Sequence, residues 1–152
     1  MGNNADEAMI TFAEGFNCSQ AVLGAFSSNF GLDPVMAYRV AAGFGGGMGH
    51  MGDTCGAVTG AFMVIGLRYG MTVLDGSQSH REAFAKVREF AEKFRALHGS
   101  IVCRDLLGLD VNDRHALREA TKKGIPQKTC PKLVWDAAEI VEGLVKVEGL
   151  VK

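Results

Sequence analysis

The chain has 152 residues and a formal net charge of −1, with 47% hydrophobic and 22% charged residues. This length suits a single domain over residues 1–152, which buries a core without disulfides or metal ions, and the composition argues against disorder. The near-neutral charge offers no field that would attract nucleic acid or an anionic membrane, so neither is an expected partner.

The first 30 residues do not resemble a secretory signal. They carry Asp6, Glu7 and Glu14 but no Lys or Arg, whereas a signal peptide has a basic start and then an apolar stretch. The longest uncharged helical stretch, residues 54–67, is shorter than the roughly 20 residues that span a bilayer. We therefore expect a cytoplasmic protein whose cysteines are reduced thiols or metal ligands rather than permanent disulfides.

Helical periodicity dominates the chain and strand alternation is nearly absent, which predicts an all-α, single-domain helical bundle. In chain order, the predicted helices span residues 5–12, 18–30, 34–42, 54–67, 78–97, 100–107, 112–124 and 131–145. Asn17 is the expected N-cap of the second helix, and Asp33 followed by Pro34 is a typical start for the third. The helix over 54–67 is apolar on all sides, so it is expected to be buried at the centre of the bundle.

Two further patterns concern the second half of the chain. The helix over 78–97 carries an apolar stripe with three- and four-residue spacing: Ala83, Phe84, Val87, Phe90, Ala91 and Phe94. The hexapeptide VEGLVK occurs twice, at 141–146 and 147–152. Six residues are too few for a structural repeat, so we interpret this duplication as a frayed helix end.

All four cysteines fall in the first turn of a predicted helix. Cys18 follows Asn17, Cys55 follows Asp53 and Thr54, Cys103 is third after Ser100, and Cys130 precedes Pro131. A helix start has unpaired N–H groups and a partial positive charge, which favour thiolate over thiol. Thiolate is the form that attacks disulfides and binds metal ions. This placement favours a chemical role over simple burial of small apolar side chains.

The cysteine spacing contains no C-x-x-C or C-x-x-C-H motif, which excludes a zinc knuckle, a thioredoxin-like motif and covalent haem attachment. A shared site therefore requires tertiary packing that brings helix starts together, and we expect Cys55 to lie within about 15 Å of another cysteine. Such a site could cycle between dithiol and disulfide. It could alternatively hold an iron–sulfur cluster or Zn²⁺ through the same four cysteines.

A glycine-rich loop over residues 43–52 leads directly to Cys55. Its formal G-x-G-x-x-G match lacks a preceding strand, so a dinucleotide site is not expected. Glycines here permit positive φ and close backbone approach, and they could surround an anionic sulfur, a cofactor or a substrate. The candidate binding residues are Gly45, Gly46, Gly47 and Gly56, with Met48 and His50 as candidate soft metal ligands. The alternative is a tight connection between closely packed helices.

Five segments together resemble one family. They are GFNCSQAV at 15–22, GFGGG at 43–47, CGAVTG at 55–60, GSIVCR at 99–104, and Cys130. In this order they resemble the C-GCAxxG-C-C family, described as redox-active, over about residues 8–145. One departure is that the chain reads Cys-Gly-Ala at 55–57 where the family name has Gly-Cys-Ala.

The resemblance implies redox activity of Cys18, Cys55, Cys103 and Cys130, which match the family's cysteines one by one, and an origin in anaerobic prokaryotes. It also extends to a region of split-Soret cytochrome c, a dimeric haem protein. The missing haem-attachment motif keeps the haem function from being carried over.

We therefore expect an oxidoreductase-like redox protein with Cys18, Cys55, Cys103 and Cys130 as its catalytic residues, acting on an unidentified redox partner or small molecule. Cys55 is expected to be the most reactive thiol, with Cys18 as its partner. The sequence requires no cofactor, and the alternatives are the metalloprotein described above and a non-catalytic helical interaction module. A symmetric homodimer is the expected assembly.

Overall fold

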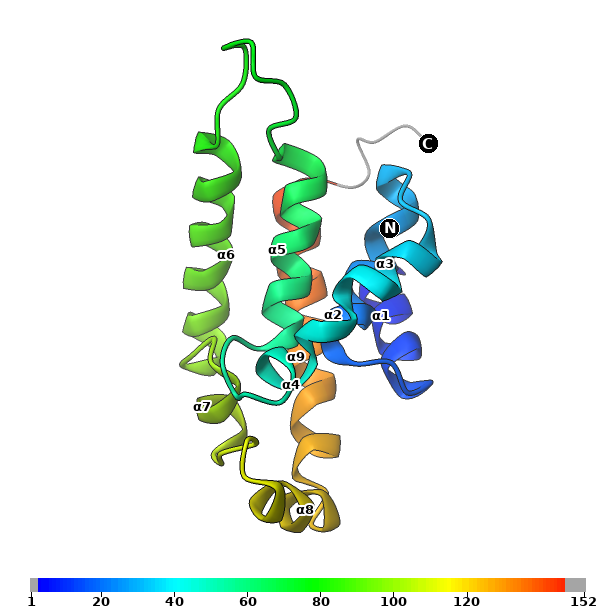
Figure 1. The fold of residues 1–152 in the computed structure, drawn as a ribbon, viewed down its shortest axis with the longest axis vertical. Helices are drawn as coiled ribbons and strands as arrows, with labels where there is room; N and C mark the ends of the chain where they lie inside the picture. The colour runs from blue at the N-terminus through cyan, green and yellow to red at the C-terminus, as the bar shows by residue number, and fades with distance from the viewer. Residues whose placement is uncertain (1–2, 147–152) are drawn as a thin grey trace.

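The computed structural model describes residues 3–146 of the protein (Figure 1). Its helices are α1 Asn3–Ala13, α2 Cys18–Ser27, α3 Pro34–Ala41, α4 Gly45–Met48, α5 Gly56–Tyr69, α6 Arg81–His98, α7 Cys103–Leu107, α8 Arg114–Lys122 and α9 Ile125–Val145, with 3₁₀ turns at Ser28–Phe30 and Ala42–Phe44. Over these residues, β pairing is limited to one isolated antiparallel bridge between Thr54 and Val102. The predicted all-α fold is confirmed.

Helix α5 lies at the centre of the bundle, as its apolar composition predicts. It packs against α2, α6 and α9, and Figure 1 shows it between α6 on one side and α2 and α3 on the other. Its first turns are fully buried, whereas Leu67 near its C-terminal end is 38% exposed. No helix in residues 3–146 is both long and apolar enough to cross a bilayer.

Small residues let α5 approach α2 closely. A Cβ atom added at Gly60 would lie 2.9 Å from the carbonyl oxygen of Ser19 and 3.0 Å from Cβ of Val22. These distances are tighter than ordinary van der Waals contact, so only glycine fits at this position without movement of α2. Close packing here brings the starts of the two helices side by side.

The predicted starts of α2 and α3 are confirmed. The Asn17 side chain accepts a hydrogen bond from the Gln20 N–H at 3.0 Å, and the Gln20 side chain accepts one from the Asn17 N–H at 3.0 Å. This reciprocal pair is a capping box. Asp33 accepts a hydrogen bond from the Met36 N–H at 3.1 Å, and Pro34 occupies the first turn of α3. Both starts follow from local hydrogen bonding that the sequence already displays.

The predicted start of the last helix is wrong. Helix α9 begins at Ile125, so Cys130 and Pro131 lie inside it. Gly124, with a left-handed φ of 76°, directly precedes α9, and Pro126 fits the first turn of a helix. Pro131 has no N–H to donate to the carbonyl of Gln127, which is an exposed residue. Cys130 therefore reaches its site from the side of a helix rather than from its start.

Two other predicted boundaries also differ. Helix α6 begins at Arg81, and Phe84 is 56% exposed rather than part of the core stripe. It stacks on the His80 ring instead, with centroids 5.2 Å apart. Helix α7 begins at Cys103 rather than near Ser100, because the residues before it pair with the segment that precedes α5. The first VEGLVK copy ends α9, and the second, at 147–152, lies outside the described residues.

The contrast between two glycines of α5 gives a test of the close contact with α2. We expect Gly60→Ala to lower the free energy of unfolding by about 1–3 kcal/mol, because the added methyl overpacks against α2. Gly66 is helical and has open space around it, so Gly66→Ala should stabilise the protein by roughly 0.5–1 kcal/mol through backbone entropy. Urea unfolding followed by circular dichroism measures both changes. Stabilisation by Gly60→Ala would contradict the packing.

Candidate functional site

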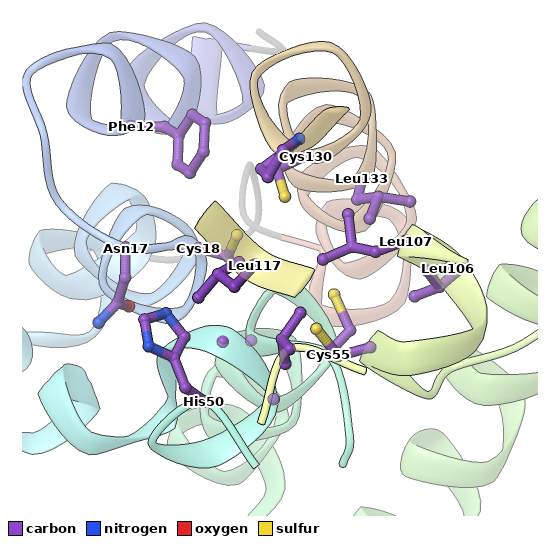
Figure 2. Close-up of a pocket in the computed structure, with 16 residues that line it drawn as sticks. Phe12, Asn17, Cys18, His50, Cys55, Leu106, Leu107, Leu117, Cys130 and Leu133 are labelled. Atoms are coloured by element: carbon purple, nitrogen blue, oxygen red, sulfur yellow. The ribbon is translucent and has the colours of Figure 1, made fainter. Parts of the chain in front are cut away.

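All four cysteines line one cavity of about 140 Å³ (Figure 2). The remainder of its wall is mostly apolar and includes Phe12, Leu106, Leu107, Val111, Leu117 and Leu133. The cysteines come from the starts of α2, α5 and α7 and from the interior of α9. The four cysteines therefore converge as expected. Cys18, Cys55 and Cys103 lie at helix starts, whereas Cys130 does not.

Cys18 is placed by the start of α2. It is the first residue of the helix, directly after the capping residue Asn17. A Cβ atom added at Gly56 would lie 3.2 Å from Cβ of Cys18, so the missing side chain at Gly56 lets the start of α5 sit against Cys18. Figure 2 shows the sulfur of Cys18 turned toward that of Cys130.

Cys55 and Cys103 are fixed by backbone pairing on either side of the Thr54–Val102 bridge. The Cys55 N–H donates to the Ile101 carbonyl at 2.8 Å, and the Cys103 N–H donates to the Asp53 carbonyl at 2.6 Å. Cys55 is the N-cap residue of α5, and Cys103 is the first residue of α7. These two hydrogen bonds hold both cysteines beside the cavity although 48 positions separate them in the sequence.

The glycine-rich loop forms a left-handed turn. Residues 46 to 50 all have φ between 61° and 68°, including the non-glycine residues Met48 and His50. A left-handed conformation costs a non-glycine residue roughly 1–2 kcal/mol, so the surrounding contacts must hold this turn. The Asp53 N–H donates to the Gly47 carbonyl at 2.9 Å, which ties the turn to the segment before Cys55.

The candidate binding glycines divide into two groups. Gly46, Gly47 and Gly56 line the cavity, whereas Gly45 lies outside its wall and packs against Asn17. A Cβ atom at Gly47 would lie 2.7 Å from Cβ of Cys103. Close packing beside the cysteines is thus their visible role, and binding of a cofactor by these glycines stays a prediction. His50 lines the cavity, whereas Met48 does not.

Cys18 and Cys130 each change the pKa of the other. A hydrogen bond between their side chains, together with burial, raises the pKa of Cys18 well above its ordinary value. The same hydrogen bond lowers the pKa of Cys130, because the Cys18 thiol stabilises the Cys130 thiolate. Both side chains are half-buried. In this pair the thiolate is disfavoured at Cys18 and favoured at Cys130.

Burial dominates the other two thiols. Cys55 is 4% exposed, and loss of hydration raises the pKa of its thiol to about 12. The N–H groups of Ala57 and Val58 at the start of α5 lower this pKa, but by less than burial raises it. Burial likewise raises the pKa of Cys103 to about 11, although Arg104 opposes the change.

These pKa shifts bear on two expectations that stay predictions. Burial disfavours ionisation of Cys55, because the helix-start effect acts in a site from which water is excluded. The pKa of Cys18 is affected most by Cys130, whereas the expected partner is Cys55. The sequence could not reveal the desolvation, because burial of Cys55 depends on helices that are remote in the chain.

The described residues offer no site for a single metal ion. Among residues 3–146, no three His, Cys, Asp or Glu side chains are grouped so that they could hold one ion. A structural zinc site needs four ligands around one centre. The four thiols as arranged here therefore do not fit Zn²⁺.

Sequence reasoning missed the cover of the cavity. Val111 and Leu117 close one wall, and Leu117 comes from α8 at the lower end of the bundle (Figure 1). Helix α8 packs mainly on α9. Glycines with left-handed φ, Gly108 and Gly124, bound this covering segment. In the sequence, this cover is indicated by Leu117, a large apolar residue in an otherwise polar helix.

One family model matches the chain. Its description is "Putative redox-active protein (C_GCAxxG_C_C)", and it matches residues 16–144, which include all four cysteines. No curated protein and no solved structure matches the chain.

The pKa directions of the four thiols predict an order of alkylation. We expect iodoacetamide at limiting concentration and neutral pH to modify Cys130 first and Cys55 last, because reaction follows thiolate fraction and access. Since thiolate accumulates as pH rises through the pKa, the lowered pKa of Cys130 shifts its alkylation profile to lower pH. Peptide mass spectrometry of the reduced, metal-free protein measures the order and the profile.

Two variants of Cys18 isolate the hydrogen bond. Cys18→Ala removes the donor and should shift the Cys130 profile to higher pH, whereas Cys18→Ser keeps a donor and should shift it less. If both variants leave the profile unchanged, the hydrogen bond does not control Cys130.

Proposed function

The chain belongs to the C_GCAxxG_C_C family, and from this membership and its site we propose that it is a thiol–disulfide redox protein that uses Cys18 and Cys130 as its exchanging pair. The observation that carries the proposal is that Cys18 and Cys130 line the same cavity, where each changes the pKa of the other. A dithiol of this kind, with one thiol ready to ionise and the other protonated, suits disulfide exchange.

The proposed reaction transfers two electrons to a disulfide. The Cys130 thiolate attacks one sulfur of the partner disulfide, the partner's S–S bond breaks, and one partner thiolate leaves. Cys18 then loses its proton and attacks the Cys130 sulfur of the mixed disulfide, which releases the second partner thiolate. The two leaving thiolates take up the protons of Cys18 and Cys130. The protein dithiol is oxidised to a disulfide, and the partner disulfide is reduced to two thiols.

The environment of the pair supports these roles. Cys130 is half-buried and has a lowered pKa, as an attacking thiol needs both access and ionisation. Cys18 has a raised pKa, so it does not compete for the first attack and is a strong nucleophile once ionised. The apolar wall around the pair limits water near the mixed disulfide. We place this activity in the cytoplasm, where reducing conditions keep thiols free.

An iron–sulfur cluster is the alternative that the same cavity supports. Cys18, Cys55, Cys103 and Cys130 would be its four ligands, since clusters are held by cysteine thiolates. The supporting observation is that all four line one cavity. The raised pKa values of Cys55 and Cys103 oppose it, because ligation requires thiolates.

The mixed disulfide can be trapped to test the exchanging pair. With excess bis(2-hydroxyethyl) disulfide, the reduced Cys18→Ser/Cys55→Ser/Cys103→Ser variant should retain one mercaptoethanol adduct on Cys130, because none of the other three cysteines remains to resolve it. The wild-type protein should form a Cys18–Cys130 disulfide without a lasting adduct, and Cys130→Ser should react at least about tenfold more slowly. Intact and peptide masses distinguish these products. An adduct found first on Cys55 or Cys103 would contradict the assignment.

Anaerobic purification tests the alternatives. We expect a colourless protein with less than about 0.1 iron or zinc per chain and four titratable thiols. A brown protein with iron and acid-labile sulfide near four per chain would contradict the dithiol proposal and establish the cluster. Thiols that resist reagents until the protein is denatured, without bound metal, would instead indicate an interaction module. Absorption spectra, elemental analysis and thiol titration supply these readouts.

A further inference from the structure

We propose that Cys55 and Cys103 form a second, internal dithiol that re-reduces the Cys18–Cys130 disulfide, so that one reduced chain delivers four electrons. This inference rests on the proposed function, because it assigns the two remaining cysteines to the same exchange site. We call Cys18 and Cys130 the outer pair and Cys55 and Cys103 the inner pair.

The two pairs differ in solvent exposure, although they lie in the same place. All four cysteines line the same cavity of about 140 Å³. The outer-pair side chains are half-buried, whereas Cys55 and Cys103 are only 4% and 8% exposed. A partner disulfide outside the protein therefore meets the outer pair first. The inner pair can reach a disulfide most readily through the cavity that it shares with the outer pair.

The charges of the two pairs change each other's pKa values. Ionisation of Cys130 raises the pKa of both Cys55 and Cys103. The charges of Cys55 and Cys103 in turn raise the pKa of Cys18. Such effects act between thiols that face the same buried site. They agree with the position of all four cysteines at the wall of one cavity.

The direction of transfer follows from access to the partner disulfide. The partner meets the more exposed outer pair first, so the outer disulfide forms while the inner thiols are still reduced. Electrons therefore flow from the inner dithiol to the outer disulfide.

The transfer balances without any further reactant. Cys103 loses its proton and attacks the Cys130 sulfur of the outer disulfide, and the Cys18 thiolate leaves and takes up a proton. Cys55 then loses its proton and attacks the Cys103 sulfur, which releases the Cys130 thiolate. One S–S bond breaks and one forms. The inner pair is oxidised by two electrons, and the outer pair is reduced by two and can react with a second partner disulfide.

Counting disulfide equivalents tests the inference. The reduced, metal-free wild-type protein is mixed anaerobically with excess bis(2-hydroxyethyl) disulfide, and the remaining thiols are blocked with N-ethylmaleimide and counted by mass. We expect two equivalents to be reduced and no blocked thiol to remain. The double variant Cys55→Ser/Cys103→Ser should reduce one equivalent, and circular dichroism verifies that it is folded.

Two further variants test the route of the electrons. Cys18→Ser/Cys130→Ser retains the inner pair, and we expect its Cys55 and Cys103 to be oxidised at least about tenfold more slowly than in the wild type. The single variant Cys55→Ser should accumulate a Cys103–Cys130 disulfide with Cys18 free, which peptide mapping identifies. Oxidation of the inner pair at the wild-type rate without the outer pair would overturn the inference.

The outcomes also separate this inference from the proposed function. One equivalent reduced by both the wild type and the inner-pair variant would overturn the internal dithiol and leave the outer-pair exchange standing. No equivalent reduced by the wild type would overturn the proposed function and the internal dithiol with it.

Discussion

The close approach of three helix starts at one cavity is the constraint on which the site depends. Gly56 lets the start of α5 sit against Cys18, and Gly47 lets the left-handed turn sit against Cys103. A side chain at either position would push apart backbone segments that carry a cysteine. The Thr54–Val102 bridge then locks the segment before α5 to the segment before α7. Without these contacts Cys18, Cys55 and Cys103 would remain at separate helix starts, and no shared cavity would form.

Within this cavity, burial and helix starts act on the thiols in opposite directions. A helix start stabilises a thiolate by up to about 2 kcal/mol in a partly buried site. The rise in the pKa of Cys55 from 9.0 to about 12 corresponds to roughly 4 kcal/mol against the thiolate. Desolvation therefore outweighs the N–H groups of α5. Cys130 has no helix start, yet its pKa is lowered, because a neighbouring thiol donates a hydrogen bond to it. In this cavity a hydrogen bond from one neighbouring thiol lowers a thiol pKa, whereas the N–H groups of a helix start do not offset burial.

The apolar wall gives the cysteines a graded environment. Leu117 from α8 and Val111 cover one side, and Leu106 and Leu133 lie beside the thiols. Such a wall stabilises neutral thiols and disulfides relative to thiolates. The half-buried and buried cysteines thus differ in exposure although they share one cavity.

The sequence by itself determined the all-α class, the capped starts of α2 and α3, and the buried character of α5, because local hydrogen bonding and apolar periodicity fix these features. It also identified the family, through short motifs around the cysteines. The tertiary structure alone decided the exposure of Phe84 and the meeting of all four cysteines at one cavity. Those features depend on which remote segments meet and on how much water they exclude. Neither quantity is encoded in the spacing of residues along one helix.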